Sequence, residues 1–518
     1  MMTLTQELSL ADAQAKKVGW RGWAALVVLM LPVLLVSVDN TVLSFALPQI
    51  ALDLGPTSTQ QLWIIDAYPL VLAGLLVTMG TLGDRFGRRK MLLIGAVGFA
   101  AVSALAAFAP TAALLIAARA LMGVFGAMLM PSTLSLLRSI FTDRDQRRLA
   151  IAVWASAFSA GAALGPIVGG ILLEHFAWGS LFLMAVPVLI PLVVLVPILV
   201  PESRDPNPGR IDVVSIALSM ATMLPIVYAI KEFAVHGFES VLPLVLVVIG
   251  VIAGVLFVRR QLALPVPMLD MALFRRGSFS GSVLVNLLSV VGLVGFLYFV
   301  AQHLQLVIGL SPLQAGLALV PGLLAMIVAG LTVVPIAKRV APRIVVPSAL
   351  AFSVLGYLLV WVSMITGSLE LLVVAFVSLG IGIGAAETVS NELILASAPP
   401  SKAGAASAVS ETAYELGAVL GTTIIGGALA ALYRANLVLP AGLPAEAAEA
   451  SRETLAGAMV AADGLDSALG AALRDAAAHA FDAGVGVTAL IGTGLVLLAA
   501  VIAALTLGRH AAAVPAEH

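Results

Sequence analysis

Seven ionisable residues lie within stretches of this chain that are otherwise apolar. They are six acids and one base: Asp39, Asp66, Glu387, Glu392, Glu411, Glu415 and Arg119. Ionisable side chains in such surroundings are costly and usually serve a function. A carboxylate there can take up and release a proton, or it can face a cationic ligand. These residues therefore predict an acid-rich cavity that binds protons or cations, with structural hydrogen bonding as the alternative role for each acid.

The acids near the C-terminus are spaced in two different ways. Glu411 and Glu415 are four residues apart, so they share one face of a helix, with Tyr414 beside them. Two carboxylates that approach in low dielectric repel each other, and a bound proton or cation relieves the repulsion. Glu387 and Glu392 lie about 140° apart around a helix, on different surfaces. Of these two, Glu387 is favoured as functional and Glu392 is expected to be solvated.

Arg119 is expected to face the core as the partner of an acid or of polar backbone, with extension to the outer surface as the alternative. Aromatic residues are candidates for the apolar lining of the cavity, although ordinary packing also fits each of them: Trp63, Tyr68, Phe158, Tyr298 and Tyr414. His303 adjoins a predicted outer loop, so we expect this side chain to be exposed to solvent.

The composition indicates what kind of protein positions these residues. Hydrophobic residues make up 61% of the 518 residues, charged residues only 11%, and the mean hydropathy is +1.10. Soluble domains carry about 25% charged residues, so the chain is predicted to be an all-α polytopic membrane protein. The net charge of −1 is uninformative about nucleic acid, but the sequence has no basic block that could follow a phosphate backbone, so nucleic acid is not an expected partner. The absence of cysteine excludes disulfides, thiolate metal sites and cysteine nucleophiles.

Missing motifs argue against further classes. The sequence contains no phosphate-binding loop, no HExxH pattern and no nucleophile elbow. An ATP-driven pump is therefore not expected. A membrane-embedded enzyme or receptor is also disfavoured, because clustered catalytic groups or a sizeable soluble domain would then be visible. No metal site and no cofactor are predicted.

Fourteen apolar stretches of about 20 residues are each long enough to cross the hydrocarbon core of a bilayer. They group as six, two and six, because polar linkers flank the central pair. The predicted parts are an N-terminal segment (1–23), a six-helix bundle (24–200), a two-helix insertion with its linkers (201–278), a second six-helix bundle (279–508) with a long outer loop (434–481), and a tail (509–518). Both termini are predicted to be cytoplasmic.

The distribution of basic residues supports this topology. With the N-terminus inside, 22 of the 27 Lys and Arg residues fall in inner segments, as is typical of membrane proteins. Arg119 lies within a span, and four basic residues are assigned to outer segments: Lys231, Arg434, Arg452 and Arg474. An error of one helix early in the count would destroy this alternation, so the even number of spans is supported.

A glycine ladder occupies one predicted span. Gly161, Gly165 and Gly169 recur every four residues and expose backbone along one face, and Pro166 and Gly170 complete the segment. Glycine and proline are tolerated in membrane helices where neighbours approach closely or the helix bends. The segment is therefore predicted to pack tightly or to act as a pivot.

The outer loop 434–481 is rich in alanine with scattered charges, and stretches such as 444–460 can form amphipathic surface helices. Two interpretations are open for this loop. It is either a solvated cover or a lid over the outer mouth of a pathway.

Several segments resemble motifs of the major facilitator superfamily. Residues 80–93 (GTLGDRFGRRKMLL) resemble its inner loop motif. Arg119 to Gly126 resembles its helix 4 motif, with Met122 in place of the frequent Gln, and 161–170 resembles its helix 5 antiporter motif. Three segments are similar to the fourteen-helix drug:proton antiporter family within it: 38–48, 303–316 and 411–417.

The resemblance implies a major facilitator fold and roles for particular residues. Asp39, Glu411 and Glu415 would couple protons or recognise cations. Asp66, Glu387 and Arg119 are added to the same candidate site because they are ionisable residues within apolar stretches. The helix 5 motif is associated with exporters. An inner gating motif, whose charges would latch the two six-helix bundles, is implied for Gly80, Gly83, Asp84, Arg85, Gly87, Arg88 and Arg89.

The family resemblance and the acids within the apolar stretches together predict a proton-coupled multidrug exporter. It would lie in a bacterial cell membrane and work by alternating access. The expected cargo is small, lipophilic and mostly cationic: quaternary ammonium compounds, dyes such as ethidium and acriflavine, and fluoroquinolones. The proton gradient would supply the energy, and the protein is expected to work as a monomer in the lipid bilayer. The alternative is an exporter of an endogenous metabolite, lipid or siderophore that carries drugs incidentally.

Overall fold

The computed structural model describes residues 18–204, 212–236, 241–265, 267, 269–397 and 403–507. The predicted N-terminal segment up to residue 17, part of the first linker (205–211) and the predicted tail 509–518 lie outside the described residues. Within these ranges, thirteen helices are long and apolar enough to cross a membrane, and a shorter apolar segment, Ala160–His175, belongs to a further long helix. The protein is therefore a multi-pass helical membrane protein, while the count of fourteen spans stays a prediction.

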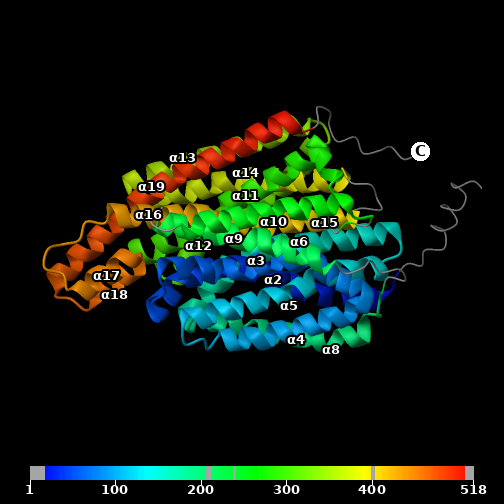
Figure 1. Cartoon of the computed structure of the whole chain (residues 1–518), viewed down its shortest axis with the longest axis horizontal. Helices are drawn as coiled ribbons and strands as arrows, with labels where there is room; N and C mark the ends of the chain where they lie inside the picture. Colours follow the sequence, from blue (N-terminus) through cyan, green and yellow to red (C-terminus); the bar gives the residue numbers. More distant parts are fainter. Residues whose placement is uncertain are drawn as a thin grey trace, which may run out of the picture.

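The N-terminal helices pack into one bundle, the lower half of Figure 1. Side chains cap several of these helices and fix where they start. Thr57 forms a capping box with Gln60, and Asp143 accepts a hydrogen bond from the Gln146 N–H. The bundle comprises α2 (Trp20–Leu54), α3 (Ser58–Phe86), α4 (Arg88–Ala106), α5 (Ala112–Ile140), α6 (Arg144–His175), α7 (Ser180–Leu183) and α8 (Ala185–Leu199).

The C-terminal helices form the other bundle, the upper half of Figure 1. Two of its spans contain a π-helical turn, a feature frequent at functional sites. These turns are η2 after α11 and η4 between α15 and α16. The bundle comprises η1 (Leu273–Arg275), α11 (Gly277–Gln302), η2 (His303–Val307), α12 (Pro312–Ala337), α13 (Pro342–Thr366), α14 (Leu369–Ala396), α15 (Ala403–Gly421), η4 (Thr422–Gly426), α16 (Gly427–Asn436) and α19 (Ser467–Thr506).

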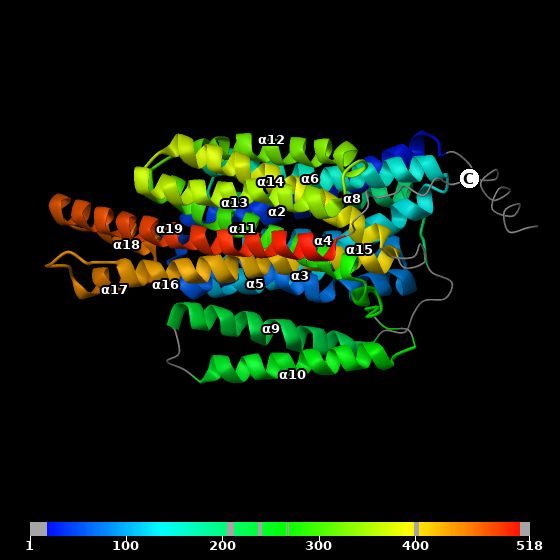
Figure 2. The same cartoon turned by 90° about the horizontal axis from the view of Figure 1, so that it is seen from above.

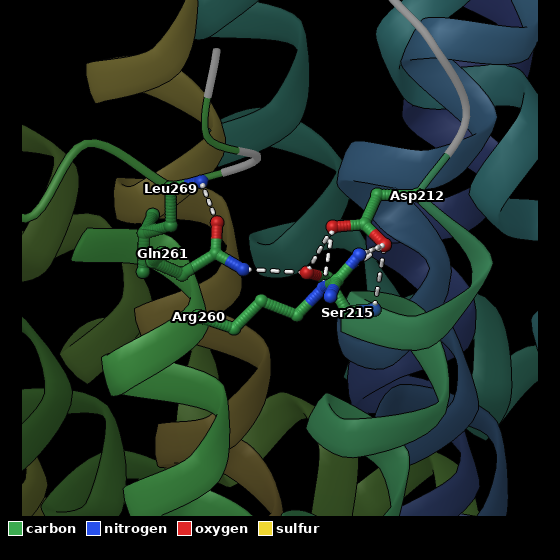
Figure 3. A network of polar contacts seen from close by, with 5 residues as sticks. All are labelled: Asp212, Ser215, Arg260, Gln261 and Leu269. Atoms are coloured by element: carbon green, nitrogen blue, oxygen red, sulfur yellow. Dashed lines mark hydrogen bonds and ion pairs between the residues drawn. The ribbon is translucent and has the colours of Figure 1, made fainter. Parts of the chain in front are cut away.

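Two helices that lie between the bundles in the sequence, α9 (Val213–His236) and α10 (Leu242–Ala263), form a hairpin on one side of the molecule (Figure 2). A polar network joins their ends (Figure 3). Asp212 caps α9 through the Ser215 N–H (3.1 Å). Arg260 donates to both carboxylate oxygens of Asp212, from Nε at 3.0 and 3.2 Å and from Nη2 at 2.8 Å. Gln261 donates to Ser215 (2.6 Å) and accepts from the Leu269 N–H (3.1 Å), which attaches the chain leading to α11. Hydrogen bonds from Arg260 hold the pKa of Asp212 below its usual range.

The glycine ladder of α6 packs tightly on two sides. A Cβ on Gly161 would lie 2.9 Å from the Leu34 carbonyl oxygen of α2. A Cβ on Gly170 would lie 2.9 Å from the Leu313 Cα of α12, in the other bundle. The ladder is therefore a packing face, as one of the two sequence interpretations predicted, and it joins α6 to both its own bundle and the opposite one.

The long loop 434–481 folds into short helices, which confirms the prediction of surface helices there. It contains α17 (Ala445–Glu453), α18 (Leu455–Asp463) and the first turns of α19. We call α17 and α18 the cap, and the end of the molecule that carries them the cap end. Ser58 at the start of α3 donates to the Glu453 carbonyl, and the Tyr433 hydroxyl donates to the Ser451 carbonyl (2.9 Å). The cap is thus bonded to helices of both bundles.

Candidate functional site

Asp39 of α2 and Arg119 of α5 form a buried ion pair at the centre of the N-terminal bundle. Arg119 Nη1 lies 2.5 Å from Asp39 Oδ2, and the arginine side chain is 1% exposed. Its Nε donates to the Ile64 carbonyl (3.2 Å), and its guanidinium lies 4.6 Å from the centroid of the Tyr68 ring. Arg119 therefore has both kinds of partner that the sequence predicted, an acid and polar backbone.

The glycines that follow Arg119 let α3 approach α5 at this pair. A Cβ on Gly123 would lie 2.7 Å from the Tyr68 carbonyl oxygen, and one on Gly126 would lie 3.0 Å from the Tyr68 ring. Tyr68 is fully buried between Arg119 and Phe99, whose ring centroid is 6.1 Å away. This aromatic residue thus packs against the buried ion pair, and its role in lining a cavity stays a prediction.

Asn40, next to Asp39, connects the two bundles. Its Nδ2 donates to Glu415 Oε1 of α15 at 3.1 Å, although the two residues are 375 positions apart. Asn40 Oδ1 and Glu415 Oε2 are buried without a hydrogen-bond partner. Asn40 is not among the residues predicted from the sequence, because a neutral amide within an apolar stretch is a weaker signal than a charge, although it lies within the segment 38–48 that carries the family resemblance.

Tyr414 lies near two acids of the C-terminal bundle, Glu387 and Glu415. The Tyr414 ring meets the Phe158 ring of α6 edge to face, with centroids 5.3 Å apart. Glu387 of α14 interacts electrostatically with Tyr414, and its Oε1 is buried without a partner. Glu411 interacts electrostatically with Arg138 of α5. Glu392 is exposed, as predicted.

Asp66 of α3 lies in a second ion pair, with Lys231 of α9. Lys231 Nζ is 2.8 Å from Asp66 Oδ2, and both side chains are 0% exposed. The assignment of Lys231 to an outer segment is therefore wrong. Lys231 lies inside helix α9, which continues to His236, and Asp66 neutralises the lysine charge within the protein.

Two of the candidate aromatic residues flank Asp66. The Trp63 ring centroid lies 3.9 Å from Lys231 Nζ and 6.2 Å from the Tyr228 ring. Tyr298 of α11 lines a cavity of about 30 Å³ between the bundles at the cap end, together with Gln61. Trp63 thus lies against a charged group, and Tyr298 lines a cavity.

The predicted inner gating motif holds the turn between α3 and α4. Asp84 Oδ1 lies 2.8 Å from Arg88 Nε, and Arg88 also donates to the Ser203 hydroxyl (3.0 Å). The backbone N–H of Arg89 donates to Glu202 (3.0 Å), a carboxylate well placed at the positive N-terminus of α4.

Glycines shape the same turn. Gly87 has φ +116°, and a Cβ there would lie 2.8 Å from the Glu202 carboxyl carbon. Gly80 and Gly83 face α5 at ordinary contact distances, and the Arg85 guanidinium lies 5.8 Å from the Phe86 ring centroid. These contacts join the motif to the segment after α8, and the latch between the bundles stays a prediction.

The expectation that His303 is exposed is wrong. The residue begins the π-helical turn η2 and is buried, with its Nδ1 2.7 Å from Asp482 Oδ1 of α19. Although His303 lies next to the loop that follows η2, its side chain is covered by α19 (Ser467–Thr506), which packs along η2 and α11.

The charges of the site are therefore distributed unequally between the bundles. Asp39 and Asp66 each have a buried cationic partner. Among the described residues, Glu387 and Glu415 have no ion pair, and each has a buried oxygen without a hydrogen bond. An ionised carboxylate buried without a cation costs several kcal/mol, and a proton or a cationic ligand removes that cost.

Comparisons with known proteins agree with this architecture. Residues 29–422 match the family model described as Major Facilitator Superfamily. The chain is 56% identical to the multidrug efflux pump LfrA of Mycolicibacterium smegmatis over 94% of this chain and 97% of LfrA. It is 37% identical to the methyl viologen resistance protein SmvA of Salmonella typhimurium, over 89% of this chain and 93% of that protein.

Solved structures share the fold. A bacterial homologue of the human lysosomal transporter Spinster, crystallised in an inward-facing and unoccupied conformation, superposes with a TM-score of 0.63 at 16% identity, over 95% of this chain and 99% of that one. The helical bundles, the motif at the turn between α3 and α4 and the match over residues 29–422 lead to one assignment. The chain belongs to the major facilitator superfamily and is a membrane transporter rather than an enzyme.

Proposed function

We propose that this protein is a proton-coupled multidrug exporter of lipophilic, mostly cationic compounds. Its similarity to LfrA, a multidrug efflux pump, and to SmvA, which confers resistance to the organic dication methyl viologen, supports export of such cargo. Quaternary ammonium compounds and the dyes ethidium and acriflavine are the expected substrates, with fluoroquinolones as further candidates. The proton gradient is the proposed energy source, and one chain is the proposed working unit.

The observation that carries this proposal is the environment of Glu415. The carboxylate lies at the contact between the bundles, where Asn40 donates to one oxygen and the other oxygen has no partner. The buried acids of the N-terminal bundle are already neutralised by Arg119 and Lys231. Glu415 is therefore a site at which a proton and an organic cation would compete.

We propose that the protein works by alternating access, in which each ligand reaches Glu415 from one side of the membrane at a time. Five hydrogen bonds that join the two bundles lie in the middle or at the cap end: Asn40–Glu415, Thr423–Asp66, Gln305–Phe45, Leu313–Glu174 and Ser58–Glu453. Such a set of contacts is expected of a transporter closed at its cap end. We propose that protonation from the outside releases the cargo, and that loss of the proton to the inside resets Glu415 for the next cation.

Ethidium efflux from proteoliposomes under an imposed pH gradient tests the proposal. We expect Glu415→Gln to lower gradient-driven efflux at least tenfold, because the amide cannot exchange a proton. Glu392→Gln is the matched control, since this exposed glutamate loses the same charge outside the site. Equal, gradient-dependent efflux by the parent and by Glu415→Gln would disprove the role of Glu415. Efflux by the parent that does not depend on the pH gradient would disprove proton coupling.

The alternative function, export of an endogenous compound, is tested by growth of a deletion strain in the absence of drug. A growth defect without drug would favour this alternative.

A further inference from the structure

Asp66 is surrounded by groups that recognise an ammonium ion. Lys231 Nζ lies 2.8 Å from the carboxylate, donates to the Leu62 carbonyl (3.1 Å) and lies 3.9 Å from the centroid of the Trp63 ring. A carboxylate, a carbonyl oxygen and an aromatic face are the partners that proteins use to bind ammonium groups. These groups form a binding site for an ammonium ion, and the side-chain ammonium of Lys231 occupies it.

Three parts of the chain meet at this site. Asp66 belongs to the N-terminal bundle, Lys231 to the α9–α10 hairpin, and Thr423, whose hydroxyl donates to Asp66 Oδ2 (3.1 Å), to the C-terminal bundle. Val227 of α9 packs with Leu70 and Val419 in one small apolar cluster directly beside them. A movement between the bundles therefore changes the surroundings of Lys231.

The site is also incompletely satisfied. Asp66 Oδ1 is buried without a hydrogen-bond partner. Apolar residues of similar volume in place of a buried ion pair are often neutral or stabilising, so stability alone does not account for this pair. Lys231 is five residues from the end of α9 at the cap end, and a lysine has a flexible stem that can carry its charge to a surface.

We propose that Lys231 is a tethered counter-ion, which an organic cation displaces from Asp66 during transport. The cargo then takes the carboxylate and the Trp63 face, while the ammonium of Lys231 turns toward the water at the cap end. The α9–α10 hairpin is accordingly a working part of the transporter and not an accessory. This inference rests on the proposed export of cations and adds a second, internally gated cation site to it.

Binding of tetraphenylphosphonium to the purified full chain tests the displacement without any proton gradient. We expect Lys231→Met to bind this cation at least tenfold more tightly than the parent, because the internal competitor is gone. The double variant Asp66→Asn/Lys231→Met should lose that gain. Lys338→Met, which removes an exposed lysine, is the matched control and should bind as the parent does. Parental or weaker affinity in folded Lys231→Met would overturn the proposal.

A measurement on the unaltered protein covers the case in which Lys231→Met does not fold. Acetylation of Lys231 by an amine-reactive reagent, read by mass spectrometry, should rise at least fivefold with saturating tetraphenylphosphonium, because the amine leaves its buried site. The isosteric anion tetraphenylborate should leave it unchanged. If Lys231 stays unmodified with the cation bound, the proposal is wrong. Neither measurement depends on a pH gradient, so a failure here is distinct from a failure of proton coupling in the efflux assay.

Discussion

At the scale of single residues, Asp39 and Asp66 of the N-terminal bundle each have a cationic partner, whereas Glu387 and Glu415 of the C-terminal bundle form no ion pair within the described part of the chain. Arg119 holds Asp39 at 2.5 Å and Lys231 holds Asp66 at 2.8 Å. Glu415 has an amide partner only, Asn40. The proton exchange of the proposed cycle is thus assigned to Glu415 of the C-terminal bundle. Asp39 is expected to act through its ion pair, and Asp66 through the displacement of Lys231.

Breaking the Asp39–Arg119 pair is predicted to destabilise the protein strongly. Arg119→Met leaves Asp39 buried without its cation, which typically costs about 3–5 kcal/mol. The double variant Asp39→Asn/Arg119→Met removes both charges and should recover most of this loss. Unfolding of the purified variants in detergent, followed by tryptophan fluorescence, measures the difference. A single variant as stable as the double variant would contradict the importance of the pair.

At the scale of elements, close helix contacts and the hairpin network determine how the parts fit together. Helix α6 touches α2 through the ladder and α12 through Gly170 and Pro166. The α9–α10 hairpin is closed by the Asp212–Arg260 pair at one end and inserts Lys231 between the bundles near the other. Small residues and a few polar contacts therefore decide which helices can approach.

Gly170→Ala is predicted to force α6 and α12 apart. Its Cβ would meet the backbone of Leu313 at 2.9 Å and of Pro312 at 3.0 Å, and backbone cannot turn aside as a flexible side chain can. We expect ethidium efflux to fall at least fivefold. Gly494→Ala is the control, because nothing lies within 4 Å of a Cβ there. The reading of α6 as a tight contact fails if both variants transport like the parent.

The Asp212–Arg260 pair is predicted to make the stability of the hairpin depend on pH. Because Arg260 holds the pKa of Asp212 below its usual range, the carboxylate contributes stability at pH values above the unfolded pKa of about 3.9. This contribution disappears as the pH falls through the lower pKa of the folded state. Asp212→Asn should therefore melt at a lower temperature than the parent at pH 7, and the difference should shrink below about pH 4. A difference that does not vary with pH would point to another cause.

At the scale of the whole molecule, the two bundles and the hairpin surround the polar residues, and the cap closes one end. The contacts between α6 and α12, between η2 and α2, and between the cap and α3 all lie at this end. Alternating access requires that these contacts break while others form at the opposite end. The cap bonds to both bundles, and its role as a lid or as a solvated cover stays a prediction.

Joining α6 to α12 covalently is predicted to stop transport. The chain has no cysteine, so Glu174→Cys/Leu313→Cys carries a single pair of thiols where the Leu313 N–H now donates to Glu174 (3.4 Å). We expect a short bifunctional methanethiosulfonate reagent to block ethidium efflux, and a reducing agent to restore it. Each single-cysteine variant treated in the same way should remain active. Undiminished efflux by the cross-linked protein would show that this contact stays closed throughout the cycle.

The sequence by itself determined the class of the protein, the apolar helices and the motifs, because hydropathy, periodicity and motif spacing are local properties of the chain. It identified Arg119 as a buried partner, and it identified Glu411 and Glu415 as residues on one face. Which charges pair was decided by the tertiary structure alone. Asp66 meets Lys231 and Asn40 meets Glu415 only after helices distant in the sequence have packed together. The same lysine therefore looked like an outer loop residue in the sequence and is a buried counter-ion in the fold.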